Sequence, residues 1–208
     1  MNNILYSFVL PSIIAYLLGS ISFSIIITWL FSKKDIRDFG SGNAGGTNVI
    51  RSVGKFAGIS TMVLDILKCV VAVLIAKYLL PGGQNAIAMS LAGLFCILGH
   101  IFPIYFSFKG GKGIAAGAGM ILVLDYRIFI ILMAIFFLSI FITKFVSLSS
   151  ILGAISFPIA TFIFAKPENQ LILTINALIV ASLVIFMHHK NIKKILNGTE
   201  NKIKFKKS

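Results

Sequence analysis

The stretch GAGMILVLDYRIFIILMAIFF, residues 117–137, decides how many times this chain crosses a membrane. Its apolar run is interrupted only at Asp125–Arg127. The stretch is either one helix with charges in its middle or two short helices, 111–124 and 127–142, joined by a tight turn. A charged side chain at the centre of a bilayer costs several kcal/mol, so the single helix is the less favourable arrangement.

The composition of the whole chain predicts an integral membrane protein. Of its 208 residues, 58% are hydrophobic and 12% are charged, and the mean hydropathy is +0.98. A soluble domain of this size has too little interior to bury that much apolar surface. Long unbroken apolar runs indicate membrane helices, because barrel strands alternate polar and apolar residues. The apolar segments are 4–31, 56–80, 84–106, 111–124, 127–142, 146–165 and 170–187.

The distribution of Lys and Arg favours seven spans. Seven spans place nearly all basic residues on one side, whereas six divide them almost evenly and leave Arg127 in lipid. Cytoplasmic loops carry the excess of basic residues. We therefore expect an all-α, seven-transmembrane-helix bundle with the N-terminus outside and the C-terminus in the cytoplasm. The segments expected at the cytoplasmic face are 32–55, 107–113, 143–149 and the chain from His188 onward; the expected outward connections are 81–83, 125–126 and 166–169.

The charge and cysteine content constrain the partners. The net charge of +13 is expected to fix topology and to meet anionic membrane lipid, so no nucleic-acid partner is expected. Cys69 and Cys96 lie inside apolar segments, where packing is the simplest role, and no metal site is indicated. We expect one membrane-embedded domain over 1–208, with a basic cytoplasmic tail from about 190 to 208.

The first polar motif is FGSGNAGGTNVIR, residues 39–51. Glycines let backbone N–H groups converge on an anion, and an Arg guanidinium can bind phosphate through two hydrogen bonds. The alternative is a flexible loop between helices. We favour a phosphate site, because a generic linker does not need two Asn and an Arg so close together. The polar side chains are Ser41, Asn43, Thr47, Asn48 and Arg51.

The second motif is GHIFPIYFSFKGGKGIAAGAG, residues 99–119. A helix beginning after its glycines would offer unpaired N–H groups to a phosphate. The motif is not a nucleotide P-loop, because Phe106 replaces the first Gly and Gly113 replaces the Ser/Thr that binds magnesium. For the small residues at 115–119 we favour helix packing, where such residues are common. His100 could be a ligand, a base or a satisfied polar residue, and we favour the last.

Three further patterns are weaker. TKFVSLSS, residues 143–150, is typical of helix capping. In HHKNIKKILNGTENK, residues 188–202, His188 and Asn191 are spaced i,i+3 and are predicted to share a helix face. Asp65 and Lys68 have the same spacing inside an apolar segment, which predicts a buried ion pair.

Taken together, GSGNAGGTNVIR, GHIFPIYFSFKGGKG and HHKNI resemble, in order and spacing, the three motifs of the bacterial acyl-phosphate:glycerol-3-phosphate acyltransferases, the PlsY family. The resemblance spans about 35–202. It implies a seven-helix enzyme of the cell (inner) membrane, with its active site facing the cytoplasm. The substrates would be acyl phosphate and glycerol 3-phosphate, the product lysophosphatidic acid, in the first committed step of phospholipid synthesis without a cofactor. The sequence departs from the usual motifs at Gly46, Ala116, Lys144 and His189-Lys190.

The resemblance also implies roles for individual residues. The residues expected at the chemical step are Ser41, Asn43, Ser147 and His188. Those expected to bind substrate phosphate are Gly42, Thr47, Asn48, Arg51, Lys109, Gly110, Gly111, Lys112, Gly113 and Asn191. Either the substrate's own phosphate or His188 would take the proton. No metal is expected.

The alternative function is a transporter of organic phosphate, which would also use basic, glycine-rich membrane loops. Transporters are commonly built from inverted repeats, with a binding site near the middle of the bilayer. The sequence shows no internal repeat, and its polar motifs gather on one predicted face. The pattern therefore favours an enzyme over a transporter.

Overall fold

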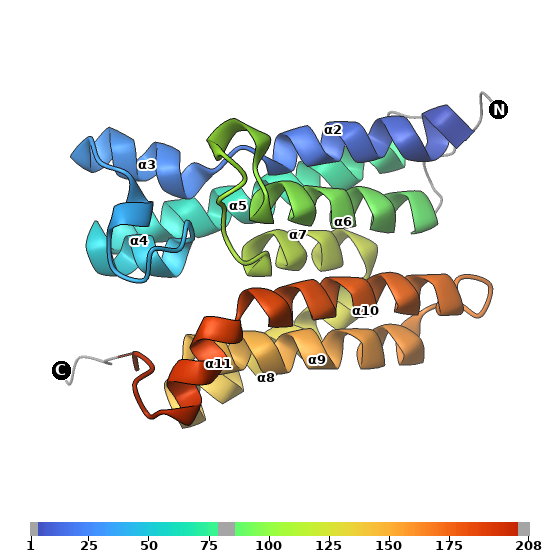
Figure 1. Ribbon diagram of the computed structural model, residues 1–208. Helices are drawn as coiled ribbons and strands as arrows, with labels where there is room; N and C mark the ends of the chain where they lie inside the picture. Colours follow the sequence, from blue (N-terminus) through green and yellow to red (C-terminus); the bar gives the residue numbers. More distant parts are fainter. Residues whose placement is uncertain (1–3, 79–85, 204–208) are drawn as a thin grey trace. The chain divides into compact units, whose positions relative to one another are not determined.

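The computed structural model describes residues 4–78 and 86–203, and every regular element in these ranges is helical (Figure 1). The predicted connection 81–83 and the tail lysines Lys204, Lys206 and Lys207 lie outside the described residues. The chain forms two compact units, Met1–Leu124 and Asp125–Ser208. The single domain expected from the sequence stays a prediction.

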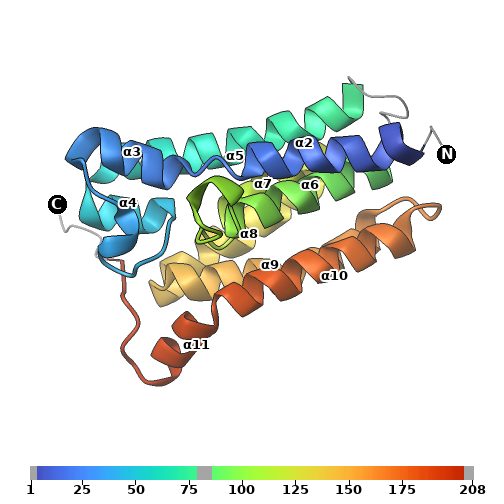
Figure 2. The same cartoon turned by 45° about the horizontal axis from the view of Figure 1, so that its top comes forward.

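The first unit surrounds the long helix α5. Helix α5 packs against α2, α4, α6 and α7, and α2 lies along α6 (Figures 1 and 2). The elements are a π-helical turn Leu5–Val9, α2 Leu10–Gly19, α3 Phe23–Ser32, a 3-10 turn Ile36–Asp38, α4 Gly46–Ser52, α5 Lys55–Tyr78, α6 Ala86–Ile101, a 3-10 turn Ile104–Phe106 and α7 Ile114–Leu124.

Glycines allow these helices to approach closely. A Cβ at Gly19 of α2 would collide with the backbone of Cys96 in α6, and one at Gly119 of α7 would collide with the Ile66 carbonyl oxygen of α5. Small residues at such crossings are the usual means of packing membrane helices. The packing role expected for the small residues of α7 is confirmed at Gly119.

The second unit is an antiparallel arrangement of long helices followed by a short one. Helix α9 packs against both α8 and α10, and α11 follows α10 after a bend at His188 (Figure 1). The helices are α8 Tyr126–Thr143, α9 Val146–Phe164, α10 Gln170–Met187 and α11 His189–Leu196.

The stretch around Asp125 forms two separate helices, as predicted. Helix α7 ends at Leu124, and Asp125 caps α8 by accepting a hydrogen bond from the Arg127 backbone N–H at 2.9 Å. Its carboxylate also pairs with the Arg127 guanidinium at 2.6 Å. Six described helical stretches are long and apolar enough to span a membrane. Helix α7 has 11 residues, or roughly 16 Å, against a hydrocarbon core of about 30 Å. The seventh span and the orientation of the termini stay predictions.

The first apolar segment, 4–31, is interrupted rather than continuous. Helix α2 ends at Gly19 and α3 begins at Phe23. The Ser20 hydroxyl donates back to the Tyr16 carbonyl at 2.8 Å, and the Ile21 carbonyl accepts a hydrogen bond from Lys68 Nζ at 2.7 Å. A buried carbonyl without a helical partner needs such a donor. Hydropathy alone does not reveal this break.

Candidate functional site

The first glycine motif forms a loop that is organised by the buried side chain of Asn48. The Asn48 Oδ1 accepts from the Ser41 backbone N–H at 3.0 Å. Its Nδ2 donates to the carbonyls of Ile36, Phe39 and Asn43 at 3.2, 2.9 and 3.2 Å. Both amide hydrogens are used in this way, one of them shared between two carbonyls, and the amide oxygen accepts one hydrogen bond. Asn48 therefore shapes the loop, and we propose this positioning role in place of the phosphate contact expected from the sequence.

Two glycines in this loop are needed for its backbone. Gly40 and Gly42 have φ of +57° and +70°, a region that residues with a Cβ rarely adopt. A Cβ at Gly40 would also collide with Asn48 Oδ1. Ala44 within the loop and Val49 just after it anchor the loop. Both are fully buried in an apolar cluster that includes Ile36.

The loop presents several of the predicted residues on its outer side. Ser41, Gly42 and Arg51 are exposed, while Asn43 and Thr47 are half-buried. These side chains and backbone groups are therefore accessible to a ligand.

The second glycine motif folds back onto the end of α6. The N–H groups of Gly110 and Gly111 donate to the carbonyls of Ile101 and His100 at 3.1 and 3.0 Å. Ser107 and Phe108 have φ of +56° and +57°, which is strained for residues with side chains and is a feature that clusters at functional sites.

Helix α7 begins directly after this loop, as the sequence predicted. Gly113, with φ of +87°, is the last residue before the helix, which starts at Ile114. Lys109 is exposed and Lys112 is half-buried. The two lysines therefore flank the glycines at a helix N-terminus, where the helix dipole favours an anion.

Arg37, a residue that the sequence analysis did not select, ties the segment just before the first glycine loop to the second loop. Its Nη1 donates to the Phe106 carbonyl at 2.9 Å and to the Lys109 carbonyl at 3.4 Å. The Asp35 carboxylate orients the guanidinium at 2.7 Å, and this hydrogen bond holds the pKa of Asp35 below its ordinary value. A pocket of about 540 Å³ lies here, lined by Asp35, Arg37, Asp38, Gly42, Ser107, Lys109 and Gly110.

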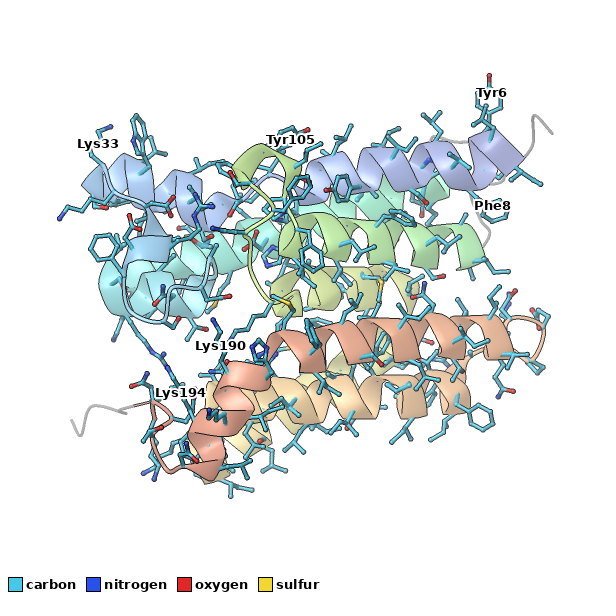
Figure 3. The ribbon with its side chains drawn as sticks, in the orientation of Figure 1. Tyr6, Phe8, Lys33, Tyr105, Lys190 and Lys194 are labelled. Atoms are coloured by element: carbon cyan, nitrogen blue, oxygen red, sulfur yellow. The ribbon has the colours of Figure 1, made fainter. Side chains whose placement is uncertain are left out.

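The second unit brings together Ser147 and Asn191 through Glu200, which the sequence analysis also missed. The Glu200 Oε1 accepts from Ser147 Oγ at 3.1 Å and from Asn191 Nδ2 at 2.9 Å. Its Oε2 is buried and has no hydrogen-bond partner among the described residues. The Ile203 N–H donates to the Lys144 carbonyl at 2.9 Å, which holds the segment after α11 beside the start of α9. Lys190 and Lys194 extend from α11 itself (Figure 3).

His188 is buried at the bend between α10 and α11. Its Nδ1 lies 2.7 Å from the Val184 carbonyl oxygen. Because a carbonyl only accepts, Nδ1 must carry a proton, and in the neutral ring Nε2 is then the acceptor.

Of the weaker sequence patterns, the buried ion pair is confirmed. Lys68 Nζ lies 2.9 Å from Asp65 Oδ1, and both side chains are buried. His100 is a satisfied buried residue, with Nδ1 3.1 Å from Lys68 Nζ. The capping expected for the 143–150 segment is wrong: α9 begins after Phe145 without a side-chain cap. The Ser149 and Ser150 hydroxyls lie inside the helix and donate back to the carbonyls of Phe145 and Val146 at 3.0 and 2.9 Å.

Gly46, one of the departures from the family motif, packs closely against Met62 and Gly58. A Cβ here would collide with the Met62 side chain and lie 3.0 Å from the Gly58 carbonyl. We expect Gly46→Ala to lower the thermal unfolding temperature in detergent by overpacking, at a cost of about 1–3 kcal/mol. The double variant Gly46→Ala, Met62→Ala should recover part of that loss. An unfolding temperature equally low in both variants would show that Met62 does not fill the space.

The whole chain is similar to known glycerol-3-phosphate acyltransferases. Residues 9–198 match the model of the glycerol-3-phosphate acyltransferase family. The chain is 45% identical to glycerol-3-phosphate acyltransferase 2 of Bacillus anthracis, covering 94% of this chain and 98% of that protein. It is 42% identical to glycerol-3-phosphate acyltransferase of Clostridioides difficile (strain 630), covering 98% of each.

The chain also resembles solved structures. A crystal structure of PlsY, an integral membrane glycerol 3-phosphate acyltransferase, in its glycerol 3-phosphate form superposes with a TM-score of 0.86 at 35% identity, covering 94% of this chain and 95% of that one. The lysophosphatidic acid form of PlsY gives a TM-score of 0.83 at 34% identity, with the same coverage.

Proposed function

Because this chain belongs to the glycerol-3-phosphate acyltransferase family, we propose that it moves a fatty acyl group from acyl phosphate to the C1 hydroxyl of glycerol 3-phosphate. The products are lysophosphatidic acid and inorganic phosphate. The observation that supports this most is the pocket that residues of both glycine loops line, Gly42 from the first and Lys109 and Gly110 from the second, beside Arg37, whose charge is shared with Asp35. Such a site suits a phosphate-bearing substrate, and Gly113 leaves the loop without the hydroxyl that a magnesium–nucleotide complex needs.

Acyl phosphate is a mixed anhydride, so the donor is already activated and no covalent acyl-enzyme is required. The C1 oxygen attacks the acyl carbon, the bond from that carbon to the phosphate oxygen breaks, and phosphate leaves with the electron pair. Holding the two substrates together contributes roughly 7–11 kcal/mol to lowering such a barrier. The protein's main task is therefore to bind and align two phosphate-bearing molecules.

The first unit supplies the phosphate contacts in this proposal. Arg51, Lys109, Lys112 and the N–H groups around Gly42, Thr47 and Gly110–Gly113 hold the phosphates. Asn43 and the Ser41 hydroxyl donate hydrogen bonds to the oxyanion that develops on the acyl oxygen. The alternative to Ser41 is Ser147 of the second unit, whose one hydroxyl hydrogen would have to leave Glu200 first. Each such donor lowers the barrier by about 2.7–4 kcal/mol.

The second unit supplies contacts to glycerol 3-phosphate. Ser147 and Asn191 already donate to an anionic acceptor, the Glu200 carboxylate, so both are oriented to bind oxygen. We assign His188 and Asn191 to orienting glycerol 3-phosphate. The site is proposed to face the cytoplasm at the cell (inner) membrane, because cytoplasmic segments carry the Lys and Arg excess.

The proton of the C1 hydroxyl goes to a phosphate oxygen of the substrates in the proposed mechanism. We expect His188→Ala to reduce activity but to keep the shape of the pH–rate profile near neutrality. If His188 is instead the general base, activity falls by about 10²–10⁴-fold and the limb near neutral pH disappears. The measurement is kcat/KM against pH for the wild-type and variant proteins in detergent.

Glu200 is expected to hold Ser147 and Asn191 in place. Glu200→Ala should raise KM for glycerol 3-phosphate about tenfold or more, because two hydrogen bonds that orient the donors are lost. Glu200→Gln keeps an acceptor oxygen and should have a smaller effect. The matched control is Glu168→Ala, an exposed glutamate of the same unit. Equal KM values for Glu200→Ala and wild type would refute the positioning role.

The proposed function is tested with purified protein in detergent, supplied with glycerol 3-phosphate and with acyl phosphate or acyl-coenzyme A in parallel reactions. Formation of lysophosphatidic acid from acyl phosphate alone supports the proposal. Formation from the thioester alone would overturn the choice of donor. No product from either donor, together with uptake of glycerol 3-phosphate into proteoliposomes, would support the transporter instead.

A further inference from the structure

A cluster of three ionisable side chains is buried beneath the glycine loops of the first unit. Asp65 and Lys68 come from α5 and His100 from α6, and each is less than a tenth exposed. Lys68 Nζ lies 2.9 Å from Asp65 Oδ1, 2.7 Å from the Ile21 carbonyl oxygen and 3.1 Å from His100 Nδ1. The mechanism above uses none of these side chains.

The contacts of Lys68 fix the tautomer of His100. An ammonium group has three N–H donors and no acceptor. Its three neighbours act as acceptors, and we assign the His100 Nδ1 lone pair to Lys68 at 3.1 Å, because the Asp65 Oδ1 that could accept from an Nδ1–H lies farther away, at 3.5 Å. In the neutral ring the proton is then on Nε2.

The Nε2 edge of His100 faces both glycine loops. A Cβ added to Gly111 would collide with His100 Nε2 and would lie 2.7 Å from the Ala44 carbonyl oxygen, which belongs to the first loop. The His100 carbonyl also accepts from the Gly111 N–H at 3.0 Å. The imidazole therefore lies where the two loops meet, next to the backbone that precedes Lys112.

We propose that His100 is a positioning residue for the reaction: Lys68 and Asp65 hold it as the Nε2–H tautomer, and this imidazole sets the spacing between the two glycine loops. The inference rests on the proposed role of these loops in binding substrate phosphate. The proposal predicts a change in substrate binding more than in the rate of the chemical step. Loss of the imidazole weakens substrate binding by letting the 107–113 loop shift, while the chemical step is affected less.

Two substitutions test the contributions of the two ring nitrogens of His100 separately. The amide of Gln reaches towards the place of Nε2, whereas the shorter Asn places its amide nearer Nδ1. We expect His100→Gln to keep KM for both substrates within about threefold of wild type, and His100→Asn to raise KM roughly tenfold with a smaller change in kcat. Equal KM values in both variants, or a loss confined to kcat, would overturn the proposal.

A double-mutant comparison tests the contact with Gly111 directly. The Cβ in Gly111→Ala meets the imidazole, so this substitution should raise KM less in a His100→Ala background than in the wild type. Gly110→Ala is the matched control, because its Cβ would meet the His100 carbonyl oxygen and lie 2.7 Å from Pro103 Cδ, neither of which His100→Ala removes. Its effect should be the same in both backgrounds. Equal coupling at Gly110 and Gly111, or none at Gly111, would contradict the proposal.

One further measurement tests the tautomer in the wild-type protein, without any substitution at His100. Nitrogen NMR of the ¹⁵N-histidine-labelled wild-type protein in detergent reports which ring nitrogen carries the proton, with the other two histidines assigned from His188→Ala and His189→Gln. A protonated Nε2 and a bare Nδ1 at His100 support the proposal, and the reverse overturns it. A wild-type protein that makes no lysophosphatidic acid would refute the proposed function, whereas an active wild type with unshifted His100 variants would refute only this inference.

Discussion

Asn48→Ala is expected to remove nearly all acyltransferase activity and to lower stability. The substitution deletes four hydrogen bonds to loop backbone. Each is worth about 0.5–1.5 kcal/mol net, and a buried carbonyl left unpaired costs about 1–3 kcal/mol. The summed loss is on the order of 3–5 kcal/mol, enough to release the 39–45 loop from its single conformation. The measurements are lysophosphatidic acid formation and thermal unfolding in detergent.

A matched control separates this effect from the loss of any asparagine. Asn197 is exposed at the end of α11, and Asn197→Ala should leave both activity and unfolding temperature close to wild type. Asn48→Asp keeps the acceptor for the Ser41 N–H but loses the two amide hydrogens, so it should resemble Asn48→Ala. If Asn48→Ala retained wild-type KM and unfolding temperature, Asn48 would not organise the loop.

Arg51→Ala is expected to reduce kcat/KM by about 10²–10³-fold, because removing one partner of a close charge pair costs about 2–5 kcal/mol. Arg51 is exposed on α4, one turn after Asn48, so its removal leaves the loop intact. Arg51→Lys keeps the charge but cannot bind phosphate through two parallel hydrogen bonds, and it should lose about tenfold. Steady-state kinetics with each substrate varied in turn make the measurement.

Lys55→Ala provides the control for charge. Lys55 is an exposed cation at the start of α5, four residues further along the chain. Its removal lowers the net charge by the same amount and should change kcat/KM by less than about threefold, as exposed charges contribute little. If both variants lost activity equally, the effect would belong to the overall positive potential and not to a phosphate contact of Arg51.

Much of the helical architecture follows from hydropathy. The predicted segments 146–165 and 170–187 correspond to α9, Val146–Phe164, and α10, Gln170–Met187. Periodic or continuous apolar sequence identifies such helices because the whole helix is covered by lipid or by other helices. The Asp65–Lys68 pair was also predictable, since an i,i+3 spacing places both side chains on one helix face.

The contacts that shape the site were not predictable in the same way. Arg37 reaches Phe106, which is 69 residues away, and Glu200 reaches Ser147, which is 53 residues away. Neither residue stands in a pattern that indicates its partner. The sequence does not distinguish the phosphate contact predicted for Asn48 from the positioning role proposed here, because the chemistry of the amide is the same whether it meets phosphate or backbone.

The sequence by itself determined the helical membrane class, the family and the two glycine motifs, because these depend on composition and on short-range spacing. Only the tertiary structure decided the break between α2 and α3, the contact of Arg37 with the second glycine loop and the proposed tautomer of His100. Each of these depends on a donor and an acceptor from distant parts of the chain meeting in a buried place. There, every polar group must find a partner that local sequence does not name.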